Sequence, residues 1–97
     1  MAFIQIVEFD TTRIDEMRER ADQYRQETEG TTAGRATVCA DRDKPDHYFL
    51  IVEFDSYEEA MRNSELPETQ RLAAEMAELG DGPPTFHYLD VVDTWEP

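Results

Sequence analysis

Basic residues are scarce in this sequence, and their scarcity limits what the protein can bind. Lysine and arginine together number 9 among 97 residues, against 23 aspartates and glutamates, and the formal net charge is −14. Nucleic-acid binding relies on lysine and arginine side chains that neutralise phosphates, and anionic membrane surfaces attract the same side chains. We therefore expect neither a nucleic acid nor a membrane as partner, and we interpret the acids as helix faces that keep the chain soluble.

Cysteine and histidine are rare as well. Cys39 is the single cysteine, so no disulfide can form within the chain, and in a strand-like segment we expect a small buried thiol. The two histidines, His47 and His87, fall in different segments, and we expect His47 to be exposed because it adjoins a polar loop. Two separated histidines, with acids spread over helix faces, predict no metal site. Glycine-rich phosphate loops and nucleophile motifs are absent too.

Long apolar runs are missing. None approaches the roughly 20 residues of a membrane-spanning helix, and Met1 leads into strand-like residues rather than into a basic stretch with a cleavage site. We therefore expect a cytoplasmic protein. The length suits one domain, which we place at residues 1–97, with 93–97 as a C-terminal tail.

Four segments rich in β-branched and aromatic residues predict strands. They are residues 2–9, 35–40, 47–54 and 85–92. After the first strand, apolar residues spaced three and four apart predict a helix that Gly30 ends. They are Ile14, Met17, Ala21, Tyr24 and Thr28.

A second helical region follows the third strand. Ser56 and Glu59 form a capping box at its start, Pro67 interrupts it, and Gly80 ends it, so we expect a kinked helix. The element order is then β-α-β-β-α-β. This order predicts an α+β, ferredoxin-like fold, with an antiparallel four-stranded sheet and helices on one face.

The predicted strands carry apolar residues on both faces. In residues 47–54, Phe49 and Ile51 point one way, and Tyr48, Leu50, Val52 and Phe54 point the other. Helices cover only one face, and a large exposed apolar patch is rare in monomers. We therefore expect a homodimer through sheet faces. The pattern leaves open which set faces the helices.

The residues around the expected kink form a distinctive pattern. Glu59-Ala-Met-Arg-Asn-Ser-Glu-Leu-Pro-Glu-Thr-Gln70 precedes Gly82-Pro-Pro-Thr-Phe86 and a strand ending Leu-Asp-Val-Val92. With this pattern the chain resembles, over nearly its whole length, the antibiotic biosynthesis monooxygenase family of the dimeric α/β-barrel superfamily. The resemblance implies a pocket between sheet and helices and cofactor-free oxidation of phenolic or quinone-like substrates by molecular oxygen. The haem-degrading branch is not matched, because residues 57–79 contain no histidine and no tryptophan.

Four polar residues are candidates for a site. Asn63 matches an asparagine of the family's kinked helix and is either a turn residue or a donor to a substrate oxygen. His87 suits either base catalysis or a hydrogen-bonded position in the core or at an interface. Tyr88 points to the opposite face from His87, so only one of them can line a pocket within the subunit. Gln5 lies in an apolar strand and needs a protein or ligand partner.

Two functions stay open at this point. The first is a cofactor-independent monooxygenase-like enzyme acting on a small aromatic or polyketide-like compound, with Asn63 and His87 catalytic and Gln5 and Tyr88 binding substrate. The second is a non-catalytic homodimer that binds a small hydrophobic ligand, and the lack of a tryptophan near the kinked helix favours it. A pocket with convergent polar groups would favour the enzyme. An interior filled by apolar side chains would favour the rival, and those side chains are Met17, Tyr24, Met61, Leu72 and Met76.

Overall fold

The structure, a computed structural model, describes residues 2–27 and 33–96. Its strands form one antiparallel sheet in the order β2-β3-β1-β4. The strand bounds are β1 Phe3–Asp10, β2 Ala33–Ala40, β3 His47–Phe54 and β4 Thr85–Asp90. The four predicted strands are confirmed, with ends displaced by no more than two residues.

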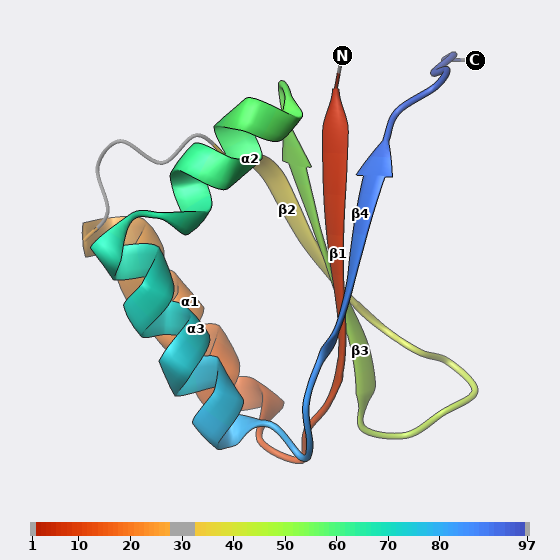
Figure 1. Cartoon of the computed structure of the whole chain (residues 1–97). Coiled ribbons are helices and arrows are strands. Elements are labelled where there is room, and N and C mark those ends of the chain that lie inside the picture. Colours follow the sequence, from red (N-terminus) through yellow and green to blue (C-terminus); the bar gives the residue numbers. More distant parts are fainter. Residues whose placement is uncertain (1, 28–32, 97) are drawn as a thin grey trace.

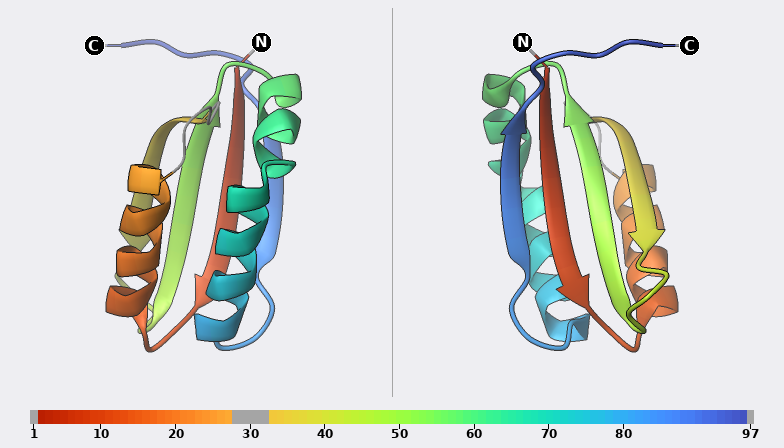
Figure 2. Two further views of the ribbon diagram at one scale, coloured as in Figure 1. Left: turned by 90° about the vertical axis from the view of Figure 1, so that its left-hand side faces the viewer. Right: turned by 90° about the vertical axis from the view of Figure 1, so that its right-hand side faces the viewer.

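The helices all lie on one side of the sheet (Figure 1). They are α1 Ile14–Glu27, α2 Tyr57–Ser64 and α3 Pro67–Leu79. Seen from the helix side, α1 lies over the part of the sheet that holds β2 and β3, and α3 lies over β1 and β4 (Figure 2, left). The expected α+β, ferredoxin-like arrangement is confirmed, with the kinked helix resolved into α2 and α3.

Local signals fix the ends of these two helices as expected. The Ser56 hydroxyl accepts a hydrogen bond from the Glu59 backbone N–H at 3.1 Å, which caps α2. Pro67 is the first residue of α3, where its missing N–H costs nothing, and Gly80 is the C-cap. The expected stop of α1 at Gly30 lies outside the described residues.

Strand register decides which residues share a face. Phe3 lies opposite Phe54, and both pack on Ala60 of α2, so their side of the sheet faces the helices. Side chains alternate along a strand, so Gln5 and Val7 share that helix side. Its opposite, which we call the outer face, is not covered by a helix (Figure 2, right). The outer face carries Ile4, Ile6 and Glu8 of β1 with their register partners on β3 and β4.

The buried core is small and lies mainly under α2. Fully buried apolar side chains are Phe3, Met17, Phe54, Ala60 and Leu79. Farther along the helix side, central-strand residues are only partly buried. On the edge strand β4, Phe86 and Tyr88 are 48% and 55% exposed although they point to the helix side. The helix layer therefore covers this face of the sheet incompletely.

Cys39 departs from its expected environment. The thiol is exposed, whereas a buried one was expected. Cys39 lies on the edge strand β2 and pairs with Phe49, which places it on the outer face. A sequence segment can predict a strand, but the edge position of that strand depends on the whole topology.

The chain leaves the sheet after β4. The Val91 N–H donates to the Ala2 carbonyl at 2.9 Å, and residues 92–96 then run on as an extended segment away from the domain (Figure 1). Within the described ranges, none of the helices combines the length and apolar character needed to cross a membrane.

Candidate functional site

Gln5 and Tyr88 lie next to each other on the helix side of the sheet. They are register partners on the antiparallel strands β1 and β4, and such partners project their side chains to the same face. Within residues 2–27 and 33–96, neither the Gln5 amide nor the Tyr88 hydroxyl has a hydrogen-bond partner. Two polar side chains without a hydrogen-bond partner among the described residues therefore project from neighbouring positions on this face.

Aromatic rings surround this polar pair. The Tyr88 ring stacks on Phe3, with centroids 6.3 Å apart and planes 20° apart, and on Phe86 at 6.4 Å and 9°. The edge of Tyr57, from the first turn of α2, meets Phe3 at 5.4 Å. The near-parallel rings of Phe3, Tyr88 and Phe86 form an apolar wall, with Tyr57 edge-on at one end. Tyr57, Phe86 and Tyr88 are about half exposed. Flat aromatic surfaces of this kind favour stacking with other flat rings.

Asn63 occupies the last turn of α2 and is buried, with only 8% of it exposed. It follows Ala60 by three residues, so both lie on the helix face that packs toward the sheet. The Asn63 carbonyl accepts a hydrogen bond from the Leu66 N–H at 3.2 Å, across the junction of α2 and α3. The backbone of Asn63 thus has the turn role that the sequence suggested.

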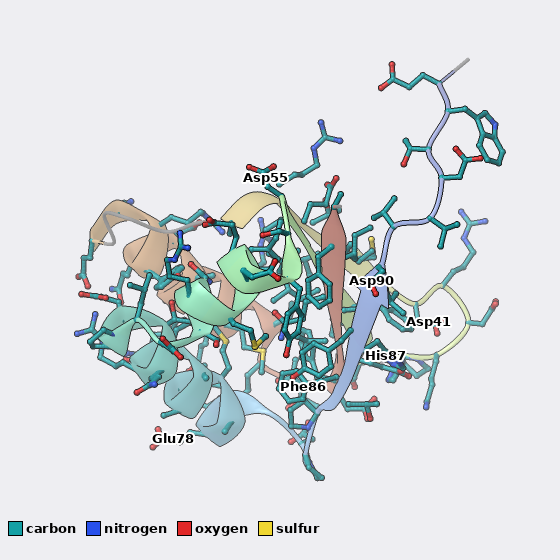
Figure 3. All side chains as sticks on the ribbon, turned by 45° about the horizontal axis from the view of Figure 1, so that its top comes forward. Asp41, Asp55, Glu78, Phe86, His87 and Asp90 are labelled. Carbon is teal, nitrogen blue, oxygen red and sulfur yellow. The ribbon has the colours of Figure 1, made fainter. Side chains whose placement is uncertain are left out.

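His87 lies on the opposite face from this group. Figure 3 shows His87 and Phe86 on opposite sides of β4. The His87 Nε2 atom lies 3.3 Å from Glu8 Oε1, on the outer face. Of the two neighbouring candidates, Tyr88 is therefore the one on the helix side.

His47 also lies on the outer face, and the expectation of an exposed His47 is wrong. Only 6% of it is exposed. Its Nδ1 atom lies 2.7 Å from Asp10 Oδ1 and its Nε2 atom 2.8 Å from Glu8 Oε2, while Phe49 packs against the ring edge-on. The hydrogen bond with Asp10, helped by the one with Glu8 and opposed by burial, raises the pKa of His47. The hydrogen bonds with His47 and His87 lower the pKa of Glu8.

The sequence contained a signal for this cluster. Glu8 and Asp10 alternate at the end of β1, and His47 begins a strand of matching length. Antiparallel pairing of β1 and β3 in the observed register brings Asp10 opposite His47. What the sequence alone did not give was the register between β1 and β3.

The geometry of the described residues does not favour a metal. No group of three or more histidine, cysteine, aspartate or glutamate side chains in residues 2–27 and 33–96 is arranged to hold an ion. A surface hollow of about 280 Å³ lies between α1 and α3. The ion pairs Arg20–Glu75 and Arg71–Glu27 line this hollow, so both of its arginines already have partners within the protein.

The interior is filled only in part. Of the five side chains that would fill it, Met17 is fully buried and the other four are partly buried. The Tyr24 hydroxyl lies 2.8 Å from the Thr69 hydroxyl and ties α1 to α3. This arrangement leaves the half-exposed wall around Tyr88 as the candidate site.

Solved structures share this fold. A variant of SnoaB, a cofactor-independent oxygenase from Streptomyces nogalater in which an asparagine is replaced by alanine, is similar with a TM-score of 0.80 and 15% identity, over 96% of this chain and 95% of that one. Rv0793 from Mycobacterium tuberculosis is similar with a TM-score of 0.79 and 15% sequence identity, and the match covers 99% of this chain and 100% of that one. A protein from Caulobacter crescentus, described as a candidate antibiotic biosynthesis monooxygenase, is similar with a TM-score of 0.80 and 11% sequence identity. The match covers 95% of this chain and 91% of that one. No protein-family model and no curated protein matches the sequence.

By its fold, the chain belongs to the α+β proteins that have a four-stranded antiparallel sheet with helices on one face. Within that class, the chain has the fold of the structures named antibiotic biosynthesis monooxygenases. The resemblance seen in the sequence is thus confirmed at the level of the fold.

Proposed function

We propose that the protein is a cofactor-independent monooxygenase-like enzyme that acts on a small aromatic or polyketide-like compound. The observation that carries this proposal is the pair formed by Gln5 and Tyr88, whose side chains have no hydrogen-bond partner among residues 2–27 and 33–96 and lie beside a half-exposed aromatic wall. Ligand sites typically combine apolar walls with a few convergent polar groups. The substrate would stack on the wall and direct an oxygen atom at the polar pair.

The proposed reaction requires few groups from the protein. An activated substrate such as an anthrone gives up a proton to solvent water and adds molecular oxygen at the resulting carbanion. The peroxide formed takes a proton back and eliminates water, which breaks the O–O bond and leaves the quinone. The protein must stabilise the negative charge that develops on the substrate oxygen, which hydrogen-bond donors positioned at that oxygen do effectively. We assign this role to the Gln5 amide and the Asn63 amide, with Tyr88 binding the ring and its oxygen.

Two observations support Asn63 in this role. It is the single asparagine of the sequence, and it is buried on the sheet-facing side of α2.

The test is oxygen consumption with an anthrone-like substrate. Gln5→Leu, Asn63→Ala and Tyr88→Phe should each lower the rate, by about 10²–10³ for a donor that stabilises the developing charge. His87→Ala is the matched control, because His87 lies on the outer face and should leave the chemical step unchanged. Rates unaffected by all three helix-side variants would exclude this site, and a loss confined to His87→Ala would place the chemistry on the outer face.

One observation favours a second function, a non-catalytic homodimer that binds a small ligand. The Gln5 amide does not titrate, so it cannot be the base that takes a proton from the substrate. A protein that only binds would give spectral changes with the same aromatic compound and no oxygen uptake. Oxygen uptake above the uncatalysed rate would exclude this alternative.

For assembly, we propose a homodimer in which a second copy covers the outer face. Apolar side chains dominate its centre, and they are Ile4, Ile6, Phe49, Ile51 and Leu89. The family resemblance implies the same mode. Sedimentation at low micromolar concentration should show a dimer, and Ile51→Lys should convert it to a folded monomer. A wild-type chain that stays a well-folded monomer would refute the proposed dimer.

A further inference from the structure

Polar residues cross the outer face in one connected chain. Asp10 contacts His47, His47 contacts Glu8, and Glu8 contacts His87, at 2.7, 2.8 and 3.3 Å. The chain joins three neighbouring strands, β3, β1 and β4, beside the apolar residue Ile6. It therefore lies within the surface that the proposed homodimer would bury.

The geometry favours the charged form of His47. Both of its ring nitrogens face carboxylate oxygens, and ionised carboxylates only accept hydrogen bonds. Below its raised pKa, His47 therefore carries hydrogens on both nitrogens and is a cation. Its positive charge balances one of the two carboxylates, Asp10 or Glu8. One negative charge is left over unless His87 also carries a second proton.

Few other charged groups face this chain. Lys44, in the connection between β2 and β3, lies near His47 and acts on it electrostatically. From the neighbouring strands, uncharged residues stand next to Glu8 and His87, and they are Ile6, Phe49, Ile51 and Thr85. The outer-face acid Glu53 lies at the other end of β3 and pairs loosely with Arg35 at 3.9 Å. The helices are on the opposite side of the sheet (Figure 2).

From this arrangement we propose that the second copy binds the outer face together with protons, one taken up by His87 in each copy. This inference rests on the proposed homodimer. Burying an uncompensated charge is costly, and a buried charge is tolerated when it is paired. Protonated His87 completes the pairing of Glu8, so association should become tighter as the pH falls. Histidine is the side chain suited to this change between about pH 5 and 8.

The experiment is sedimentation equilibrium at pH 6 and pH 8 at one ionic strength. For the wild-type protein, the dimer dissociation constant should be about tenfold or more lower at pH 6 than at pH 8. The reason is that each of the two copies has one charge neutralised at the lower pH. His87→Gln should remove most of this difference. Glu8→Gln should remove the surplus charge and give a tighter dimer at pH 8. Glu53→Gln is the matched control, because Glu53 is an outer-face acid that does not belong to the row of hydrogen bonds from Asp10 to His87. This variant should leave the pH dependence intact.

The outcomes separate the two proposals. A wild-type dimer of equal affinity at both pH values overturns the proton linkage and leaves the homodimer standing. A monomer at every pH overturns both. Equal loss of the pH dependence in Glu53→Gln and His87→Gln attributes the effect to overall charge, which also overturns the linkage. His87 is 43% exposed in its side chain, so His87→Gln should fold even where Glu8→Gln does not, and circular dichroism verifies this.

Discussion

The Thr11 hydroxyl donates a hydrogen bond to the Leu79 carbonyl at 2.7 Å, across 68 residues of sequence. The same hydroxyl accepts from the Arg13 N–H at 2.9 Å. Thr11 is completely buried. One side chain therefore joins the end of β1, the entry to α1 and the last turn of α3, and it satisfies a carbonyl that a helix C-terminus leaves without an internal partner.

This contact predicts a stability effect. Thr11→Val keeps the volume but removes the hydroxyl, leaving the Leu79 carbonyl and the Arg13 N–H without their partner. Loss of a buried hydrogen bond of this kind costs about 1–3 kcal/mol. Urea denaturation should show this loss in the free energy of unfolding. Thr12→Val is the control, because the Thr12 side chain is exposed and should change stability by no more than about 0.5 kcal/mol; equal effects at both positions would contradict the assigned role of Thr11.

The hydrogen bonds of His47 with Asp10 and Glu8 predict a particular pH dependence of stability. A group whose pKa is raised on folding stabilises the protein below its unfolded pKa, and the effect is lost as the pH rises through the folded value. For His47 that loss begins above the usual value of 6.5. Glu8 has a lowered pKa, so its contribution is present above 4.5 and is lost as the pH falls toward its folded value. Both contributions coexist between about pH 4.5 and 6.5.

The measurement compares wild-type protein with His47→Gln in urea from pH 4 to pH 9. The wild-type advantage should be greatest between about pH 4.5 and 6.5 and should shrink on both sides. His87→Gln serves as the comparison, since it leaves the His47–Asp10 contact in place. A wild-type advantage that stayed constant across the range would show that His47 stabilises the sheet by packing alone.

The N-cap of α2 gives a third prediction. Ser56→Ala removes the acceptor for the Glu59 N–H and should destabilise the protein by about 0.5–2 kcal/mol. Ser56→Asp should restore most of the loss, because aspartate is an equally good N-cap. Ser64→Ala, at the far end of the same helix, removes only an exposed hydroxyl bond to the Met61 carbonyl. Thermal unfolding of the three variants would refute capping if Ser56→Asp behaved like Ser56→Ala.

Local patterns in the sequence were sufficient to predict the elements, the start of α2 and both ends of α3. Ser56, Pro67 and Gly80 act within one turn of the chain, so their roles can be inferred from spacing alone. The alternation in residues 47–54 predicted a strand and two apolar faces, and the strand has those bounds.

Non-local features could not be obtained in the same way. The burial of His47 depends on the register between β1 and β3, which sets residues 37 positions apart opposite each other. The exposure of Cys39 depends on β2 lying at the sheet edge. The choice of Tyr88 over His87 for the helix side depends on where α2 packs, and the sequence had left both open.

Two phenylalanines on the same side of the sheet provide the last prediction. Phe54 is 5% exposed and packs with Phe3 and Ala60, so Phe54→Ala should leave a cavity that costs about 3–5 kcal/mol. Phe86 is 48% exposed and stacks on Tyr88.

Phe86→Ala therefore removes little buried surface, and its cost should be well below half of the loss in Phe54→Ala. Its main effect should appear as weaker binding of an aromatic probe, followed by tyrosine fluorescence with the protein folded, because the wall beside Tyr88 loses one ring. Phe86→Leu is the matched variant that keeps apolar area without a flat ring, and it should bind the probe as poorly as Phe86→Ala. Full binding by Phe86→Leu would show that hydrophobic cover, rather than ring stacking, is what this wall provides.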